Sequence, residues 1–173
     1  MGASLRAVDG AVTNDVPKQL ADLPSDATHL VLSVGGNDLL TCAGDLLRAP
    51  VNVSSDAFSV AGSGRGRVRI HVPASRGSCL ATGLPLVVCT IYDGNFADRE
   101  FQTMAGVGVM AFNDRILRFA LEKGLRSVDL RLICTQAEDY ANPIEPSAVG
   151  GAKIGRAIWH TISCRLGSAY NCD

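Results

Sequence analysis

Apolar runs that alternate with helical patterns along the chain predict its main elements. His29–Val34 and Leu84–Tyr92 are almost continuously apolar, which is typical of strands covered on both faces of a sheet. Arg126–Leu132 predicts a third strand, and Leu5–Val8 predicts a short early one. Strands that alternate with helices indicate an α/β fold with a parallel sheet and right-handed crossovers.

Helical spacing appears in three places. A short helix is expected between Thr13 and Pro24, and a long one from about Asp98 to Lys123. The apolar stripe of the long helix is expected to consist of Val109, Phe112, Ile116 and Ala120. Ser147 is placed to cap a last helix, in which isoleucine recurs at every fourth position, at Ile154, Ile158 and Ile162.

The segment Val53–Thr82 has neither a helical nor an alternating period over most of its length, although an α/β layout needs a crossover helix here. We therefore expect one domain over residues 1–173 with an irregular segment at 53–82. Three interpretations remain open: a loop insertion, the product of out-of-frame translation, or an anion-binding patch. The patch would be formed by Arg65, Arg67, Arg69 and Arg76.

Length, charge and cysteine content narrow the class of protein. A chain of 173 residues with 47% hydrophobic residues suits one compact domain, and its net charge of −1 gives no reason to expect nucleic acid or an anionic membrane as partner. No apolar run approaches the roughly 18 residues of a membrane helix. The six cysteines form no CxxC pair, so reduced thiols in a cytoplasmic protein are expected.

Two polar segments carry candidate chemistry. VGGND, at 34–38, is expected to form a polar hairpin at the tip of the first long apolar run, and NPIEPS, at 142–147, is expected to be a loop that leads into the last helix. Together with AVDGAV at 7–12, their order and spacing resemble the SGNH, or GDSL, family of esterases and lipases. The resemblance covers Arg6–Leu47 and Leu84–Ile162. It implies a flavodoxin-like three-layer α/β/α sandwich with a mostly parallel sheet.

The resemblance also implies roles for particular residues. In this family a serine attacks an ester carbonyl, an Asp–His pair activates the serine, and backbone and amide N–H groups hold the developing oxyanion. Gly10 and Asn37 match the oxyanion donors, and one such donor is worth roughly 10² to 10³ in rate. The candidate catalytic residues are Asn37, Gly10, Glu145 and Asn142. The candidate substrate-binding residues are Gly35, Gly36, Asp38 and Asp93.

The sequence departs from the family pattern at the groups that do the chemistry. It has no GDS motif, so we expect a chain truncated before the first strand and its serine, with a sheet that lacks this strand. The early strand would then pair differently or not at all, and stability would be marginal. The DxxH position reads Asn142-Pro143-Ile144-Glu145, and Glu145 could act as a base only if burial or neighbouring carboxylates raised its pKa.

Three functions therefore remain. The first is an impaired relative of the ester hydrolases that acts on a small-molecule ester without a cofactor. The second is a non-catalytic small-molecule binding module on the same fold. The third is an unrelated enzyme of flavodoxin-like fold that uses acidic residues with a metal. The sequence determines neither the substrate nor the oligomeric state.

Overall fold

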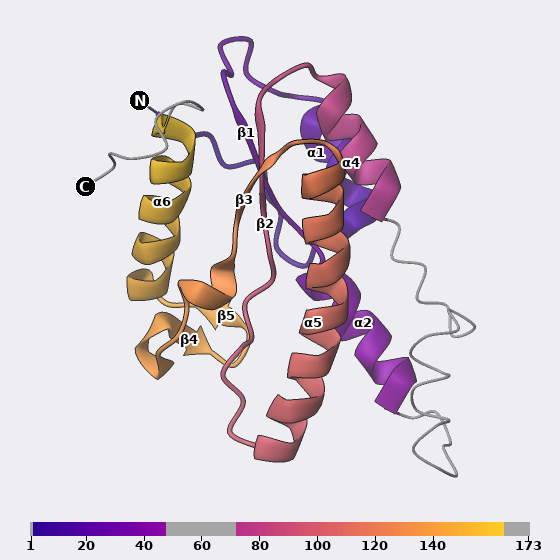
Figure 1. The fold of residues 1–173 in the computed structure, drawn as a ribbon, viewed down its shortest axis with the longest axis vertical. Helices are drawn as coiled ribbons and strands as arrows, with labels where there is room; N and C mark the ends of the chain where they lie inside the picture. The colour runs from indigo at the N-terminus through magenta and orange to yellow at the C-terminus, as the bar shows by residue number, and fades with distance from the viewer. Residues whose placement is uncertain (1, 48–71, 165–173) are drawn as a thin grey trace.

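The computed structural model describes residues 2–47 and 72–164, in which a parallel sheet lies between two layers of helices (Figure 1). Val31 lies opposite Val87, and Val88 lies opposite Ser127. The sheet has the order β1-β2-β3, and its strands are β1 (Leu30–Ser33), β2 (Leu86–Cys89) and β3 (Arg126–Val128). The predicted three-layer α/β/α sandwich with a parallel sheet is confirmed.

One face of the sheet carries several helices and the other carries one (Figure 1). The first layer contains α1 (Val16–Leu20), α2 (Gly36–Leu47), α4 (Val72–Ala81) and α5 (Arg99–Glu122). Helix α6 (Ala148–Ser163) covers the opposite face. Short 3-10 turns lie at Thr13–Asp15, Leu130–Leu132 and Ala137–Asp139, and strands β4 (Tyr140–Asn142) and β5 (Glu145–Pro146) form an antiparallel hairpin before α6.

The two longest helices begin where their capping residues predict. The Asp98 carboxylate accepts hydrogen bonds from the N–H groups of Glu100 and Phe101 at the start of α5. The predicted stripe of α5 is buried in full, at Val109, Phe112, Ile116 and Ala120. Ser147 caps α6, and the isoleucines of that helix pack against Val87 and Val128. Both helix predictions are confirmed.

Strand β2 is the centre of the core because both of its faces are covered. Leu86 and Val88 pack with α1, α4 and α5, whereas Val87 and Cys89 pack under α6. Strand β1 was expected to be covered in the same way, and this is wrong. Its exposure alternates and Val31 is 42% exposed, because α6 packs over β2 and β3.

Three further expectations are corrected. Leu5–Val8 is not a strand and pairs with none of the described strands, and the side chains of Leu5 and Val8 are 86% and 65% exposed. The polar tip at Gly35–Asp38 is the start of a helix, since Gly36 opens α2. Val72–Ala81 is helix α4 rather than irregular, and its Cys79 and Leu80 pack into the core. The rest of the anomalous segment, with Arg65, Arg67 and Arg69, lies outside the described residues.

Three cysteines of the described part are core residues. Cys79, Cys89 and Cys134 are buried as free thiols, and burial raises the pKa of Cys89 to about 12. These side chains therefore act as small apolar groups rather than as nucleophiles. None of the helices in residues 2–47 and 72–164 combines the length and apolar character that crossing a bilayer requires.

Candidate functional site

Asn37 and the Gly10 turn, predicted from the sequence to act together, lie side by side. Asn37 stands in the first turn of α2, and its side-chain Nδ2 donates a hydrogen bond of 2.9 Å to the Ala11 carbonyl oxygen. Gly10 precedes Ala11 with φ +74°, a left-handed conformation that glycine adopts without strain. An asparagine amide has two N–H donors, so this bond leaves one of them for a ligand.

A second hydrogen bond fixes the same turn against α2. The Asp38 carboxylate accepts from the Thr13 N–H at 3.0 Å, and the Thr13 side chain is 1% exposed. The Thr13 hydroxyl has no hydrogen-bond partner among the described residues. Asp38 is thus committed to the backbone of the Gly10–Thr13 segment, which it holds in place. Its predicted contact with substrate stays a prediction.

Gly35 joins β1 to α2 where side chains from two other elements come close. Its φ is +118°, and a Cβ there would lie 3.3 Å from Ile91 Cδ1 and 3.8 Å from Phe112 Cδ1. The strand can turn into α2 at this position because glycine has no Cβ. Gly36 follows as the first residue of α2.

The remaining candidates, Asp93, Asn142 and Glu145, form a separate group beyond the carboxyl end of β2. The Asn95 N–H donates to the Pro143 carbonyl at 2.9 Å, and the Tyr92 hydroxyl donates to the Ile144 carbonyl at 2.7 Å. These bonds join the Asp93–Asn95 loop to the β4–β5 hairpin. The hairpin was not expected from the sequence, which predicts only a loop there.

Within the hairpin, Asn142 and Glu145 bond to each other. Asn142 Oδ1 accepts from the N–H groups of Ile144 and Glu145 at 3.0 and 2.9 Å, and Asn142 Nδ2 donates to Glu145 Oε2 at 2.6 Å. Both residues are exposed. The Asn142 side chain therefore shapes the turn, and the Glu145 carboxylate lies in water with an amide as partner. The action of Glu145 as a base therefore stays a prediction.

Several polar residues near Asp93 were not singled out from the sequence. Asp129 lies directly after β3 and accepts from Thr90 Oγ1 at 2.9 Å and from Arg131 Nε at 2.9 Å. The Arg131 guanidinium holds the pKa of Asp129 below its usual range. The hydrogen bond to Asp129 is the main cause that raises the pKa of Arg131, and the charge of Asp93 adds a smaller contribution in the same direction. The only sequence signal for this network is that each residue closely follows a strand end.

The two groups of candidates are linked through the sheet rather than by direct contact. Among the described residues, no hydrogen bond joins Gly10 or Asn37 to Asp93, Asn142 or Glu145. Gly35 meets the Ile91 side chain, and Asp93 follows Ile91 by two residues. Both groups therefore lie at the carboxyl end of the parallel strands, where ligands bind in open α/β sheets.

Asp139 is a structural residue that ties α6 to the backbone of Thr135 and Gln136. Its side chain is fully buried, and its Oδ1 lies 2.6 Å from Lys153 Nζ on α6. Its Oδ2 accepts from the N–H groups of Thr135 and Gln136. The hydrogen bond from Lys153 is the main cause that lowers the pKa of Asp139. Within residues 2–47 and 72–164, no group of three potential metal ligands gathers.

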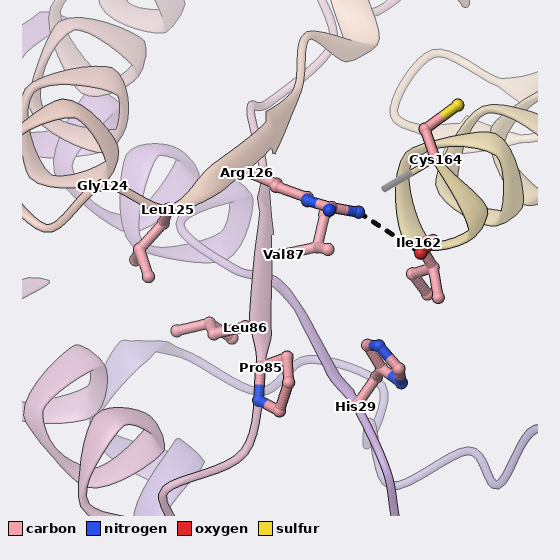
Figure 2. Close-up of a pocket in the computed structure, with 9 residues that line it drawn as sticks. All are labelled: His29, Pro85, Leu86, Val87, Gly124, Leu125, Arg126, Ile162 and Cys164. Carbon is pink, nitrogen blue, oxygen red and sulfur yellow. Dashed lines mark hydrogen bonds between the residues drawn. The ribbon is translucent and has the colours of Figure 1, made fainter. Parts of the chain in front are cut away.

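Histidine lies away from both groups. His29 precedes β1 and lines a hollow of about 360 Å³ between the amino ends of the strands and the end of α6 (Figure 2). Arg126 crosses this hollow and donates to the carbonyls of Thr161 and Ile162, where it neutralises the carbonyl end of α6. His160 is exposed on α6, and His71 lies outside the described residues.

Comparison with known proteins identifies the fold. No family model and no curated protein matches this chain. Among solved structures it is similar to a GDSL-like lipase from Bacteroides thetaiotaomicron, with a TM-score of 0.57, 13% identity, and coverage of 88% of this chain and 71% of that one. It is similar to an extracellular lipase from Streptomyces rimosus, with a TM-score of 0.59, 17% identity, and coverage of 88% and 77%. A phospholipase A1 from Streptomyces albidoflavus gives a TM-score of 0.60, 18% identity and coverage of 88% and 77%.

Identities this low establish the fold alone. The chain has an SGNH/GDSL hydrolase-like fold, which confirms the architecture that the sequence resemblance implied.

Proposed function

We propose that this chain is a relative of the SGNH/GDSL ester hydrolases that binds the carbonyl oxygen of a small-molecule ester between Asn37 and the Gly10 turn, and that its ester turnover is impaired. The observation that carries the proposal is the 2.9 Å hydrogen bond from Asn37 Nδ2 to the Ala11 carbonyl. It holds the amide beside Gly10 with one N–H donor still available. Preorganised donors of this kind favour an oxygen that gains negative charge.

Impaired turnover follows from the groups around this pair. Within the described residues, no serine or histidine side chain is hydrogen-bonded to Gly10, Ala11 or Asn37. Glu145, the candidate base, is exposed and bonded to Asn142. Among the described residues, an ester held at Asn37 would therefore meet a polarising donor but no hydrogen-bonded serine or histidine to act as an activated nucleophile. This arrangement also favours the second candidate function, in which the chain binds an ester or acyl group without hydrolysing it.

The test compares binding with turnover. Ethyl butyrate is titrated into ¹⁵N-labelled protein while the side-chain amide signals of Asn37 are followed by NMR. Hydrolysis of p-nitrophenyl acetate is measured in parallel. Asn37→Asp removes the amide donors with little change in shape. Asn95→Asp makes the same chemical change at an exposed side chain outside the proposed site and serves as the matched control.

We expect the Asn37 signals to move on titration, with turnover far below that of a complete hydrolase. Asn37→Asp should weaken binding about tenfold, which corresponds to one lost hydrogen bond. If the wild-type chain hydrolyses the ester, the same change should lower kcat/KM by roughly 10² to 10³. Binding that is equal in wild type, Asn37→Asp and Asn95→Asp would refute the assignment of Asn37. Efficient turnover that survives Asn37→Asp would refute the proposed impairment.

A further inference from the structure

The Ile91 side chain reaches the two glycines that precede Asn37. A Cβ on Gly35 would lie 3.3 Å from Ile91 Cδ1 and 3.9 Å from Ile91 Cγ1, and a Cβ on Gly36 would lie 4.0 Å from Ile91 Cγ2. Because glycine has no side chain, Ile91 takes up the space beside the backbone of both residues. The Ile91 side chain therefore borders the chain where it passes from β1 into α2.

Ile91 itself is held in place by a buried amide. Asn113 Oδ1 accepts from the Ile91 N–H at 2.7 Å, and Asn113 Nδ2 donates to the Ile91 carbonyl at 2.8 Å. Asn113 is fully buried, so water does not compete for these two bonds. The Ile91 side chain also packs against the core cluster that contains Val88 and Ile116. A side chain anchored at its backbone and in a close-packed core transmits its position to the segment that it contacts.

The first turn of α2 is held on both sides of Asn37. After Asn37, helix α5 approaches so closely at Gly108 that a Cβ there would lie 2.8 Å from Leu39 Cδ1. Before Asn37, the contact is with Ile91. Gly35 has φ +118°, and a glycine pair restricts its own backbone very little, so an outside contact has to fix its conformation. The direction of the first turn, and with it that of the Asn37 amide, therefore depends on Ile91.

We propose that Ile91 is a positioning residue for ester binding at Asn37. Its side chain sets where α2 begins, and this keeps Asn37 Nδ2 at 2.9 Å from the Ala11 carbonyl with the second N–H available to a ligand. An amide that samples several orientations has to be ordered again when the ligand binds, and this ordering lowers the affinity. The role of Ile91 in binding rests on the proposed function, whereas its effect on the Asn37 amide is measurable without a ligand.

The test shortens Ile91 in two steps and follows the side-chain amide signals of Asn37 by NMR in the ligand-free protein. Ile91→Val removes Cδ1, the atom nearest to Gly35, and Ile91→Ala also removes the γ carbons. Ile158→Val removes the same methyl group from a partly buried isoleucine under α6 and is the matched control. In both Ile91 variants the Asn37 amide protons should shift toward the values of a free asparagine and exchange faster with water, with the larger change in Ile91→Ala. Ile158→Val also loses core packing but should leave these signals unchanged.

Titration with ethyl butyrate gives the second readout, under conditions in which each variant is folded, so that a loss of stability alone does not lower the affinity. The affinity should fall about threefold in Ile91→Val and about tenfold in Ile91→Ala, which equals the loss of one hydrogen bond at Asn37. Unchanged Asn37 signals in both ligand-free Ile91 variants would overturn the proposal, as would an equal loss of affinity in Ile158→Val. Asn37 signals that stay in place when the ester is added to the wild type would instead overturn the proposed function, and with it the role of Ile91 in binding.

Discussion

Asn113 on α5 is expected to be the polar side chain whose loss unfolds this protein most easily. It is fully buried, its Oδ1 accepts from the Ile91 N–H at 2.7 Å, and its Nδ2 donates to the Ile91 carbonyl at 2.8 Å. The Asn113 side chain thus pairs both backbone groups of Ile91, just beyond β2, as a neighbouring strand would. It also holds the Ile91 side chain against Gly35, where β1 turns into α2.

The magnitude follows from the two backbone groups that would lose their partner. Asn113→Leu keeps a side chain of similar size but leaves the N–H and C=O of Ile91 unpaired. At about 1 to 3 kcal/mol for each such group, the free energy of unfolding should fall by about 2 to 6 kcal/mol. The total free energy of unfolding of a domain is roughly 5 to 15 kcal/mol, so this single change removes a large fraction of its stability.

A second substitution distinguishes the contribution of the Asn113 N–H donor from that of its oxygen acceptor. Asn113→Asp keeps an oxygen for the Ile91 N–H but places a carboxylate against the Ile91 carbonyl. Burial and this repulsion should raise the pKa of the new carboxyl group in the folded state. A raised folded-state pKa means that the protonated form, which can donate to the carbonyl, stabilises the fold at low pH. The deficit relative to wild type should therefore grow as the pH rises through that pKa.

The assay is urea unfolding followed by circular dichroism, with linear extrapolation to water. Ala111→Leu, at an exposed position of the same helix, is the control and should change stability by less than about 0.5 kcal/mol. The reasoning is refuted if Asn113→Leu costs less than about 1 kcal/mol, because the Ile91 groups would then have another partner. It is also refuted if the deficit of Asn113→Asp does not depend on pH.

Two other predictions concern α6 and the residues that hold it. Because Lys153 lowers the folded-state pKa of Asp139, this carboxylate stabilises the fold above its unfolded pKa of about 3.9, and the contribution is lost as the pH falls through the lower folded value. The melting temperature of the wild type should therefore decrease once the pH is lowered below about 4. Asp139→Asn should have a lower melting temperature at neutral pH and should lose less of it on acidification. Parallel curves of melting temperature against pH for the two proteins would contradict this. Gly150→Ala should destabilise strongly because its Cβ would overlap the Asp139 carbonyl oxygen, whereas Gly151→Ala, with open space around it, should stabilise by about 0.5 to 1 kcal/mol. Equal melting temperatures for the two alanine variants would show that α6 shifts to relieve the overlap.

Elements with a clear local pattern could be predicted from the sequence. The apolar stripe of α5 and the Ser147 cap of α6 depend on residues only a few positions apart, so both can be predicted from the sequence. The order and spacing of their motifs also led us to expect Asn37 and Gly10 near each other, and Asn37 does bond to the residue after Gly10, whereas their role in one site stays a prediction. Leu5–Val8 has the composition of a strand, but a strand needs a neighbour to satisfy its backbone, and none of the described strands pairs with it.

Other features were decided by the tertiary structure. The sequence determined a parallel α/β fold and a polar end to its strands, because hydrophobic period and capping residues act over a few positions. It did not determine that Asn113 bonds to Ile91, that Asp139 pairs with Lys153, or that Glu145 bonds to Asn142 rather than to a catalytic partner. Each of these depends on which two elements the packing of α5, α6 and the β4–β5 hairpin brings within hydrogen-bonding distance. Such distances are set by the three-dimensional packing, and the order of residues along the chain carries no direct record of them.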